Sequence, residues 1–380
     1  MNKHEFQAVL AEYAIVKDRD FSNSDLSGVD LSGAVFVGCN FSGANLNGSD
    51  ASNTSFSQCS FRHSQMHKVQ LVSTVLNKND FCAATLSESV MANGVVTQCN
   101  FEHSVLNAIH WQSAILRQCS FKQSQWLNAM LSGSVVQDSQ LQDCTFSGAK
   151  LEKVAFDGVV FGQANFSGAT LLKSYMSECD LSACQLQRAV LSKMQMNHCN
   201  LNGQNLAGCH MEQSYFIASQ LVEANLSGVQ AQHAVFQKAD LRGASFSNAI
   251  LNGANFDGAK LCEANFSGAS LMQSQMTNID GRGVRLEQSN CQNSDFSHAD
   301  LSFAKLTVAN FERCRFHRIK QENTDWHGST RIGASGDDER KVSAEDWQVP
   351  NSIAMEIQQA VEQTRSHAQS LIMNQQEAIV

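Results

Sequence analysis

Cysteine is the residue type in this 380-residue chain best suited to metal binding, and its spacing is regular. Zinc requires four ligands that converge in a tetrahedron, whereas cysteines repeated along a straight ladder offer adjacent pairs at most. We therefore predict no metal site and interpret these cysteines as small buried residues, which suits a reducing cytoplasm. Six of the 13 cysteines differ in position by multiples of twenty: Cys39, Cys59, Cys99, Cys119, Cys179 and Cys199.

Serine, histidine and aspartate could in principle form a hydrolytic triad, but their pattern does not favour catalysis. Serine and aspartate are abundant throughout the chain, so chance matches to a triad carry no weight. Catalysis requires groups from different segments to converge in a concave, water-restricted pocket. Because no inserted loop interrupts the regular pattern described next, we predict no catalytic residues, no cofactor and no enzymatic activity.

The pattern that positions all these residues has a period of five. Every fifth residue from Phe21 to Phe316 belongs to a mostly large apolar series, which contains twenty of the 22 phenylalanines. A second series of small residues, such as Cys39 and Ala44, precedes it by two positions. A helix repeats at 3.6 residues and a strand at 2, so a period of five predicts a chain that turns a corner every five residues. The cysteine spacing of twenty predicts four such sides per coil.

Units such as Ala44–Leu46 and Ala164–Phe166 resemble the A-(N/D)-(L/F)-x-x repeat of the pentapeptide-repeat family. The resemblance covers residues 19–328. It implies a right-handed quadrilateral β-helix. With the length of the repeat and the patterns at its ends, we expect an all-β solenoid of about 15 coils with helical segments at its two ends. Units of this kind cannot bury a core alone and must stack on their neighbours.

Four segments are expected along the chain: a capping helix in residues 1–18, the β-helix in 19–328, a polar linker in 329–350 and an amphipathic helix in 351–380. The first helix is predicted from apolar residues at helical spacing between positions 2 and 17. The last helix could pack on the end of the rod, along its side or against a partner's copy. Dimerisation through C-terminal ends, implied by the family resemblance, favours an oligomerisation role for its apolar residues Ile353, Ile357, Val361 and Leu371.

The charge of the chain argues against direct binding of nucleic acid. Its formal net charge is −9, and residues 19–328 hold 25 acidic and 21 basic residues, a net of −4. By resemblance, the alternative function is a DNA-mimic modulator of a type II topoisomerase (gyrase). A duplex carries one charge per about 1.7 Å, so a mixed charge of −4 makes a poor mimic. The sequence also contains no apolar run of the ~18 residues that a membrane span needs, so no membrane association is predicted.

One outward-facing column differs from the other three. The residue just before each large apolar one points outward, and from Val35 to Val235 nine of eleven such residues are apolar or tyrosine. The corresponding columns of eleven residues that begin at Asp25, Asp30 and Asn40 contain one, three and one apolar residue or tyrosine. An exposed apolar surface of this length is typical of an interface. We call its members the apolar stripe and predict that they bind a partner: Val35, Val75, Val95, Ile115, Val135, Tyr175, Tyr215 and Val235.

The apolar stripe could also arise without a partner, in either of two ways. β-Branched residues suit strands in general, and the C-terminal helix could fold back over the column. The sequence as a whole predicts a non-enzymatic protein–protein interaction scaffold or adaptor with an unidentified protein partner, a homodimer being one alternative. By resemblance to pentapeptide-repeat proteins of bacteria, a role accessory to a secretion system is expected.

Overall fold

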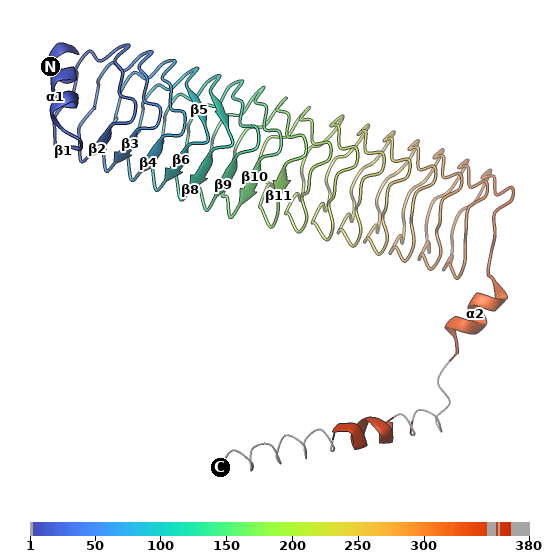
Figure 1. Cartoon of the computed structure of the whole chain (residues 1–380). Helices are drawn as coiled ribbons and strands as arrows, with labels where there is room; N and C mark the ends of the chain where they lie inside the picture. The colour runs from blue at the N-terminus through green and yellow to red at the C-terminus, as the bar shows by residue number, and fades with distance from the viewer. Residues whose placement is uncertain (1–2, 348–354, 356–357, 366–380) are drawn as a thin grey trace, which may run out of the picture. The chain divides into compact units, whose positions relative to one another are not determined.

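The computed structural model describes residues 3–347, 355 and 358–365, and it separates into two units, residues 1–335 and 336–380. The first unit is a solenoid in which each coil pairs in parallel with the coil twenty residues later (Figure 1). The pairing begins at Val16–Phe36 and continues to Arg315–Ser335, which corresponds to about 16 coils of 20 residues. The expected class of fold is therefore confirmed, and the solenoid has about one coil more than the 15 expected.

Short strands on one face form a nine-stranded parallel sheet, in the order β1-β2-β3-β4-β6-β8-β9-β10-β11. A second face carries the two-stranded pair β5 (Val90–Ala92) and β7 (His110–Gln112). Elsewhere in the described solenoid the coils are joined by isolated bridges. The strands of the large sheet are β1 (Val16–Lys17), β2 (Val35–Val37), β3 (Ser55–Ser57), β4 (Val75–Asn77), β6 (Val95–Thr97), β8 (Ile115–Arg117), β9 (Val135–Gln137), β10 (Ala155–Asp157) and β11 (Tyr175–Met176).

The core consists of the two series of residues that the period of five places inward. Large and small members alike are almost completely buried along the rod. Equivalent phenylalanines of successive coils stack face to face. The ring centroid of Phe81 lies 4.6 Å from that of Phe61 and 4.6 Å from that of Phe101, and the ring planes are nearly parallel. The spacing follows from the distance of about 4.8 Å between paired strands. Burial of one large apolar side chain per five residues makes the rod stable without disulfides.

The corners of the coils depend on residues in the left-handed backbone conformation. The position two residues after each large residue has a positive φ along nearly the whole rod, whether it is glycine, as in Gly28 (66°), or another residue, as in His63 (57°). For L-residues other than glycine this conformation costs roughly 1–2 kcal/mol. Asparagine, aspartate and histidine tolerate it best, and they are frequent at these corners.

The N-terminal helix is shorter than predicted. Helix α1 (Lys3–Glu12) ends before Tyr13, and Val16 instead takes an inward position and pairs with Phe36 in the sheet. Phe6 of α1 is fully buried against Phe21, with ring centroids 4.9 Å apart. The helix thus covers the open end of the first coil, whose apolar core would otherwise face water.

The C-terminal boundary of the solenoid also differs from the prediction. Coil pairing continues to Ser335 rather than 328, although Gln321 and Arg331 occupy positions that hold large apolar residues elsewhere. The ladder persists because it uses main-chain groups, while the apolar pattern that signals it in the sequence has already ended. In the second unit, α2 (Glu339–Glu345) lies within the predicted linker, and Asp338 caps it by accepting hydrogen bonds from the backbone N–H groups of Arg340 and Lys341.

The predicted C-terminal amphipathic helix lies only partly within the described residues. Residues 358–365 are helical, and Val361 is exposed. The other residues predicted to support oligomerisation, Ile353, Ile357 and Leu371, lie outside the described residues. Their proposed role therefore stays a prediction.

Candidate protein-interaction face

The structure brings the eight residues of the apolar stripe onto one face, in register from coil to coil. Val75 pairs with Val95, Val95 with Ile115 and Ile115 with Val135. All eight side chains are half-buried or exposed, and Val75, Tyr175 and Tyr215 are about 40% exposed. The strands labelled β2, β3, β4, β6, β8, β9, β10 and β11 along one edge of the rod in Figure 1 mark this face. These side chains are accessible to solvent without any rearrangement of the core.

Local structure explains part of the composition of the stripe. On this face each coil from β2 to β11 has an extended strand of two or three residues whose middle or last residue points inward, and β-branched residues suit that conformation. The stripe continues, however, beyond β11 to Tyr215 and Val235, where the described coils form only isolated bridges. Strand propensity therefore does not account for the whole stripe.

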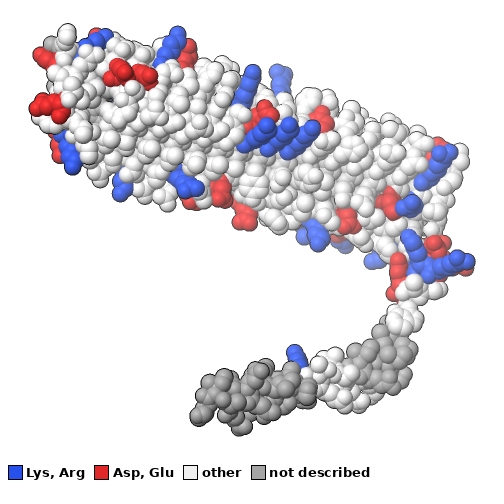
Figure 2. Space-filling model, in the orientation of Figure 1, with Lys and Arg blue, Asp and Glu red and all other residues white. Residues whose placement is uncertain are grey.

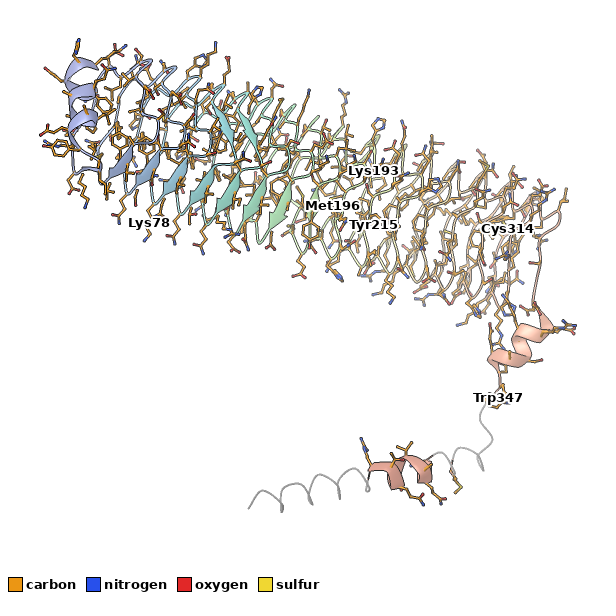
Figure 3. The ribbon with its side chains drawn as sticks, in the orientation of Figure 1. Lys78, Lys193, Met196, Tyr215, Cys314 and Trp347 are labelled. Atoms are coloured by element: carbon orange, nitrogen blue, oxygen red, sulfur yellow. The ribbon has the colours of Figure 1, made fainter. Side chains whose placement is uncertain are left out.

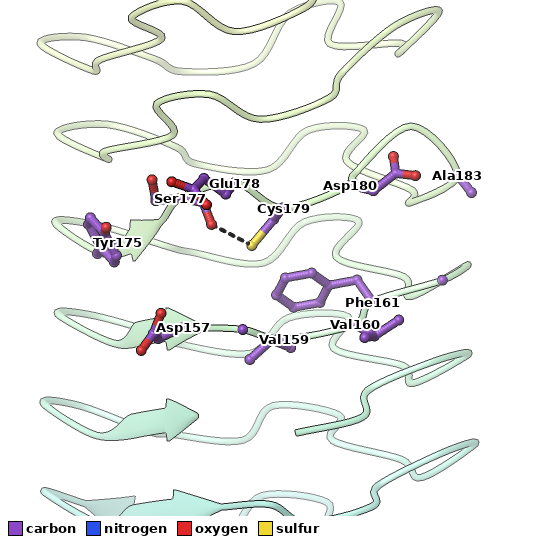
Figure 4. Close-up of a pocket in the computed structure, with 12 residues that line it drawn as sticks. Asp157, Val159, Val160, Phe161, Tyr175, Ser177, Glu178, Cys179, Asp180 and Ala183 are labelled. Atoms are coloured by element: carbon purple, nitrogen blue, oxygen red, sulfur yellow. Dashed lines mark hydrogen bonds between the residues drawn. The ribbon is translucent and has the colours of Figure 1, made fainter. Parts of the chain in front are cut away.

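A crevice interrupts this side of the rod next to Tyr175 (Figure 4). It has a volume of about 570 Å³ and lies between two successive coils, with Asp157, Phe161, Glu178 and Asp180 among its lining residues. Successive coils of the rod normally pair through main-chain hydrogen bonds. The crevice separates two of them, so it marks a local break in this pairing. The crevice leaves an open space beside Tyr175, next to the stripe.

The missing hydrogen bonds identify where the ladder fails. In the preceding step Leu141 N donates to Val160 O at 2.8 Å. Among the described residues, no backbone hydrogen bond makes the equivalent connection from Phe161 to Asp180 one coil later. The left-handed corner residue there is Gly162 (φ 54°), one position earlier than the usual corner. The displaced corner accounts for the separation of the two coils.

The glycine that displaces this corner is a signal that the sequence interpretation missed. Nearly all glycines of the rod lie two positions after the large residue, whereas Gly162 lies one position after Phe161. A glycine outside the common register indicates a corner of a different conformation. The crevice could therefore have been suspected at this coil, although not its size.

Charged residues border the stripe along both of its sides. Asp157 and Glu178 lie at one corner of the face, and Asp180 lies in the outward column of the next face. Hydrogen bonds from the Ser182 hydroxyl and backbone N–H hold the pKa of Asp180 below its ordinary value. At the opposite corner Lys153, Lys173 and Lys193 occupy equivalent positions in three successive coils. These six residues have no ion-pair partner among the described residues. Figure 2 shows cationic side chains gathered midway along the rod, and Figure 3 labels Lys193 there.

The cysteines of the ladder are core residues, as their spacing predicts. Eleven of the 13 are buried, and Cys82 and Cys262 are half-buried. Burial raises the pKa of Cys99 to about 12 and that of Cys144 to about 11. For Cys99 and Cys144 the neutral thiol is therefore the form present near neutral pH, whereas a metal ligand or nucleophile must be a thiolate. Cys39 differs, because hydrogen bonding with the Cys59 thiol lowers its pKa to about 7.

Two exposed apolar residues near the C-terminal end of the rod were not anticipated. Phe303 and Val308 occupy corners with φ of 62° and 58°, and their side chains are 57% and 61% exposed. A β-branched residue in this conformation is an outlier, and backbone strain of this kind is frequent at functional sites. The signal available in the sequence was an apolar residue at a position that elsewhere holds mostly glycine or polar residues.

Replacing Val308 with Asn is expected to stabilise the last coils by roughly 1 kcal/mol, because asparagine adopts the left-handed conformation with less strain and little apolar contact is lost. Thermal unfolding followed by circular dichroism provides the measurement. Thr307→Asn, at the neighbouring position without positive φ, is the matched control and should change the melting temperature little. A melting temperature that falls for Val308→Asn would show that the valine side chain contributes packing instead.

Two protein-family models match this chain. They are pentapeptide repeats, in residues 20–50, 39–77, 239–278 and 282–318, and the pentapeptide repeat region, in residues 149–226 and 179–256. Together they cover more than half of the chain. No curated protein matches the sequence. Among the described residues, no helix is both long and apolar enough to cross a membrane.

Several solved structures are similar to this chain. HetL from Nostoc sp. strain PCC 7120, a pentapeptide repeat protein involved in heterocyst differentiation regulation, is 21% identical over 60% of this chain and 87% of its own, with a TM-score of 0.23. QnrB1, a plasmid-mediated fluoroquinolone resistance protein, is 22% identical over 57% of this chain and 97% of its own, with a TM-score of 0.29. A pentapeptide repeat protein of the Arabidopsis thaliana thylakoid lumen is 30% identical over 28% of this chain and 67% of its own, with a TM-score of 0.21. The chain belongs to the pentapeptide-repeat family and folds as its right-handed quadrilateral β-helix.

Proposed function

We propose that this protein is a non-enzymatic interaction scaffold that binds a protein partner through the apolar stripe. The observation that carries the proposal is the in-register exposure of apolar and tyrosine side chains along one face, from Val35 to beyond the end of the sheet at Tyr215. Contiguous apolar surface of this extent is uncommon on soluble monomers and usually marks an interface. Aromatic residues such as Tyr175 commonly contribute much of the binding energy at such sites.

Catalysis has no comparable support on this surface. The crevice is lined by carboxylates and a buried neutral thiol, but no histidine lies among its lining residues and the adjacent corner is open to solvent. The mixed charge of the rod likewise gives DNA mimicry no support beyond family resemblance. Cytoplasmic location and an accessory role in bacterial secretion stay predictions, and the genes that neighbour this one would test the second.

The proposal predicts that changing Val95, Ile115 and Val135 together to Glu abolishes association through this face. Three charges would have to be desolvated against an apolar surface, whereas the inward residues and hence the fold stay unchanged. The measurement is affinity capture with tagged protein from native extract, combined with light scattering of the purified chain. Binding of any wild-type associate should fall at least roughly tenfold.

The matched control places three glutamates on the opposite face of the same coils, at Val105, Gln125 and Thr145. These outward residues also pair in register, and their change should leave both the melting temperature and association unaltered. If the stripe variant and the control variant retain all associations of the wild type equally, the stripe reflects strand propensity alone and the proposed function is wrong.

A further inference from the structure

We propose that the partner on this face is a second copy of the chain, packed side by side with its rod axis parallel to the first. The inference rests on the proposed function of the apolar stripe and adds the identity and orientation of the partner. Three observations carry it: the unpaired lysines at one corner of the face, the unpaired carboxylates at the other, and the self-complementary apolar column between them.

The lysines at positions 153, 173 and 193 form what we call the lysine ladder. Coils are spaced by about 4.8 Å, so three exposed ammonium groups in equivalent positions repel one another. Other charged groups of the rod have found partners, such as Arg62, which lies 2.8 Å from Asp80, and Arg242, which lies 2.7 Å from Asp240. Lys153, Lys173 and Lys193 have no such neighbour among the described residues, although all three side chains are exposed. A negatively charged partner surface would relieve this repulsion.

The complementary surface is the acidic rim of the crevice, formed by Asp157, Glu178 and Asp180. Asp157 accepts a hydrogen bond from the Gln137 side chain at 3.2 Å, and Asp180 accepts one from Asn200 at 3.0 Å, but these donors are neutral. Asp157 and Glu178 of the rim occupy the same coils as Lys153 and Lys173, at the opposite corner of the face, whereas Asp180 lies on the adjacent face. Each surface is therefore placed to meet its counterpart on another copy.

Symmetry determines which packing brings the two corners together. When two copies pack by this face with a two-fold axis along the rod, the copies run parallel and the left and right corners of the face exchange. Lys153 of one copy then faces Asp157 of the other at the same level, and Lys173 faces Glu178. The two-fold axis generates each pair twice, and the apolar stripe meets itself along its whole length.

The antiparallel alternative is less favourable. A two-fold axis across the rod at Val135 also overlays the stripe on itself, but it keeps each corner on its own side. Asp157 would face Arg117, while Asp138 would lie opposite Asp138 of the second copy. The lysine ladder would gain no carboxylate, because it would face the neutral residues Ser113, Asn93 and Ser73. Exposed ion pairs contribute little affinity individually, but such pairs and like-charge contacts determine register and orientation.

The size of the face is sufficient for a reversible dimer. From Val35 to Val235 the stripe spans ten coil steps, or roughly 48 Å at about 4.8 Å per step. A face roughly 13 Å wide would bury on the order of 600 Å² per copy, or about 1,200 Å² in total. This lies just above the ~1,000 Å² expected of a specific interface. The dimer should therefore dissociate measurably on dilution.

A charge exchange in the full-length chain tests the orientation. One variant carries Lys153→Glu and Lys173→Glu, and the other carries Asp157→Lys and Glu178→Lys. Each variant alone would place like charges opposite each other, so its dimer should weaken at least roughly tenfold, as measured by analytical ultracentrifugation at low salt. An equimolar mixture should form a heterodimer, because both contacts between the two variants are then attractive. The control, Arg285→Glu with Lys305→Glu, reverses two stacked cations on the opposite face and should leave the dimer unchanged.

The outcomes separate this inference from the proposed function. A wild-type dimer that resists both charge variants but is lost in the Val95, Ile115 and Val135 variant would overturn the parallel orientation while leaving the stripe as the interface. A wild-type chain that is monomeric at about 100 µM, yet captures another protein through the stripe, would overturn the second copy as partner. Weakened single variants together with a restored mixture would support the inference.

Discussion

Replacing Phe81 with Asp is expected to unfold the coils around it and lower the free energy of unfolding by more than about 4 kcal/mol. The Phe81 ring is fully buried between Phe61 and Phe101, at 4.6 Å from each ring centroid, so the substitution removes two stacking contacts and buries a charge without a partner. Each coil contacts mainly its neighbours, so the loss should begin locally and expose main-chain amides of three coils. Thermal unfolding and hydrogen exchange measure the two effects.

The control for this prediction is Gln65→Asp, which introduces the same charge at an exposed, outward position one coil earlier. Its free energy of unfolding should stay within about 0.5 kcal/mol of the wild type, as is usual for surface substitutions. Equal loss of stability in the two variants would contradict the assignment of inward and outward positions on which every surface argument depends.

The second large effect is expected at Gln204, a long polar residue at a position that elsewhere holds small ones. Its side chain is almost completely buried, and Nε2 donates to the carbonyl oxygens of Leu181, Ser182 and Cys184 at 2.7–3.0 Å. Among the described residues, the carbonyls of Ser182 and Cys184 have no other hydrogen-bond donor. The amide therefore substitutes for ladder bonds that are missing near the crevice.

Changing Gln204 to Leu should cost about 2–4 kcal/mol, because the buried carbonyl of Cys184 and the half-buried carbonyl of Ser182 lose their donor while the volume of the side chain is nearly kept. Hydrogen exchange should accelerate most in residues 180–208, beside the crevice. Gln185→Leu, at an exposed outward position of the preceding coil, is the matched control. Unchanged exchange near the crevice in Gln204→Leu would show that water, rather than this amide, satisfies the carbonyls.

Much of the rod is predictable from the sequence because its periodic pattern has a single geometric solution. A period of five with four sides per coil assigns an inward or outward direction to each residue, and the structure places Phe81, Cys99 and Val95 accordingly. The same arithmetic brings the residues of the stripe into one column, although they are twenty or more residues apart. Its role in binding does not follow from that placement and stays a proposal.

The structure departs from the prediction where main-chain pairing does not follow the pattern of apolar side chains. At the ends, the ladder continues through Val16 and to Ser335 because backbone pairing does not need large apolar residues in every position. At the crevice, Phe161 keeps its place in the apolar series, so the pattern gives no warning that the coil opens. The displaced glycine at position 162 carries the only local signal, and it predicts a changed corner rather than a cavity.

The flanking charges could not be interpreted from the sequence alone. Lys153 and Asp157 are close in the sequence, which invites interpretation as a local pair. The structure places them at opposite corners of one face, and an ion pair between them is absent from the described residues. Only this separation turns an ordinary mixture of charges into two surfaces that can meet across an interface.

The most direct test of the proposed interface is photo-crosslinking from its centre. A photoreactive phenylalanine analogue replaces Tyr175, which is 40% exposed on the stripe, or Gln125, which is exposed on the opposite face. We expect irradiation of intact cells to yield a protein adduct from position 175 and little or none from position 125, with the mass of two copies if the partner is the chain itself. Equal yields from both positions, or an adduct from position 125 alone, would contradict the claim that the apolar stripe is an interface.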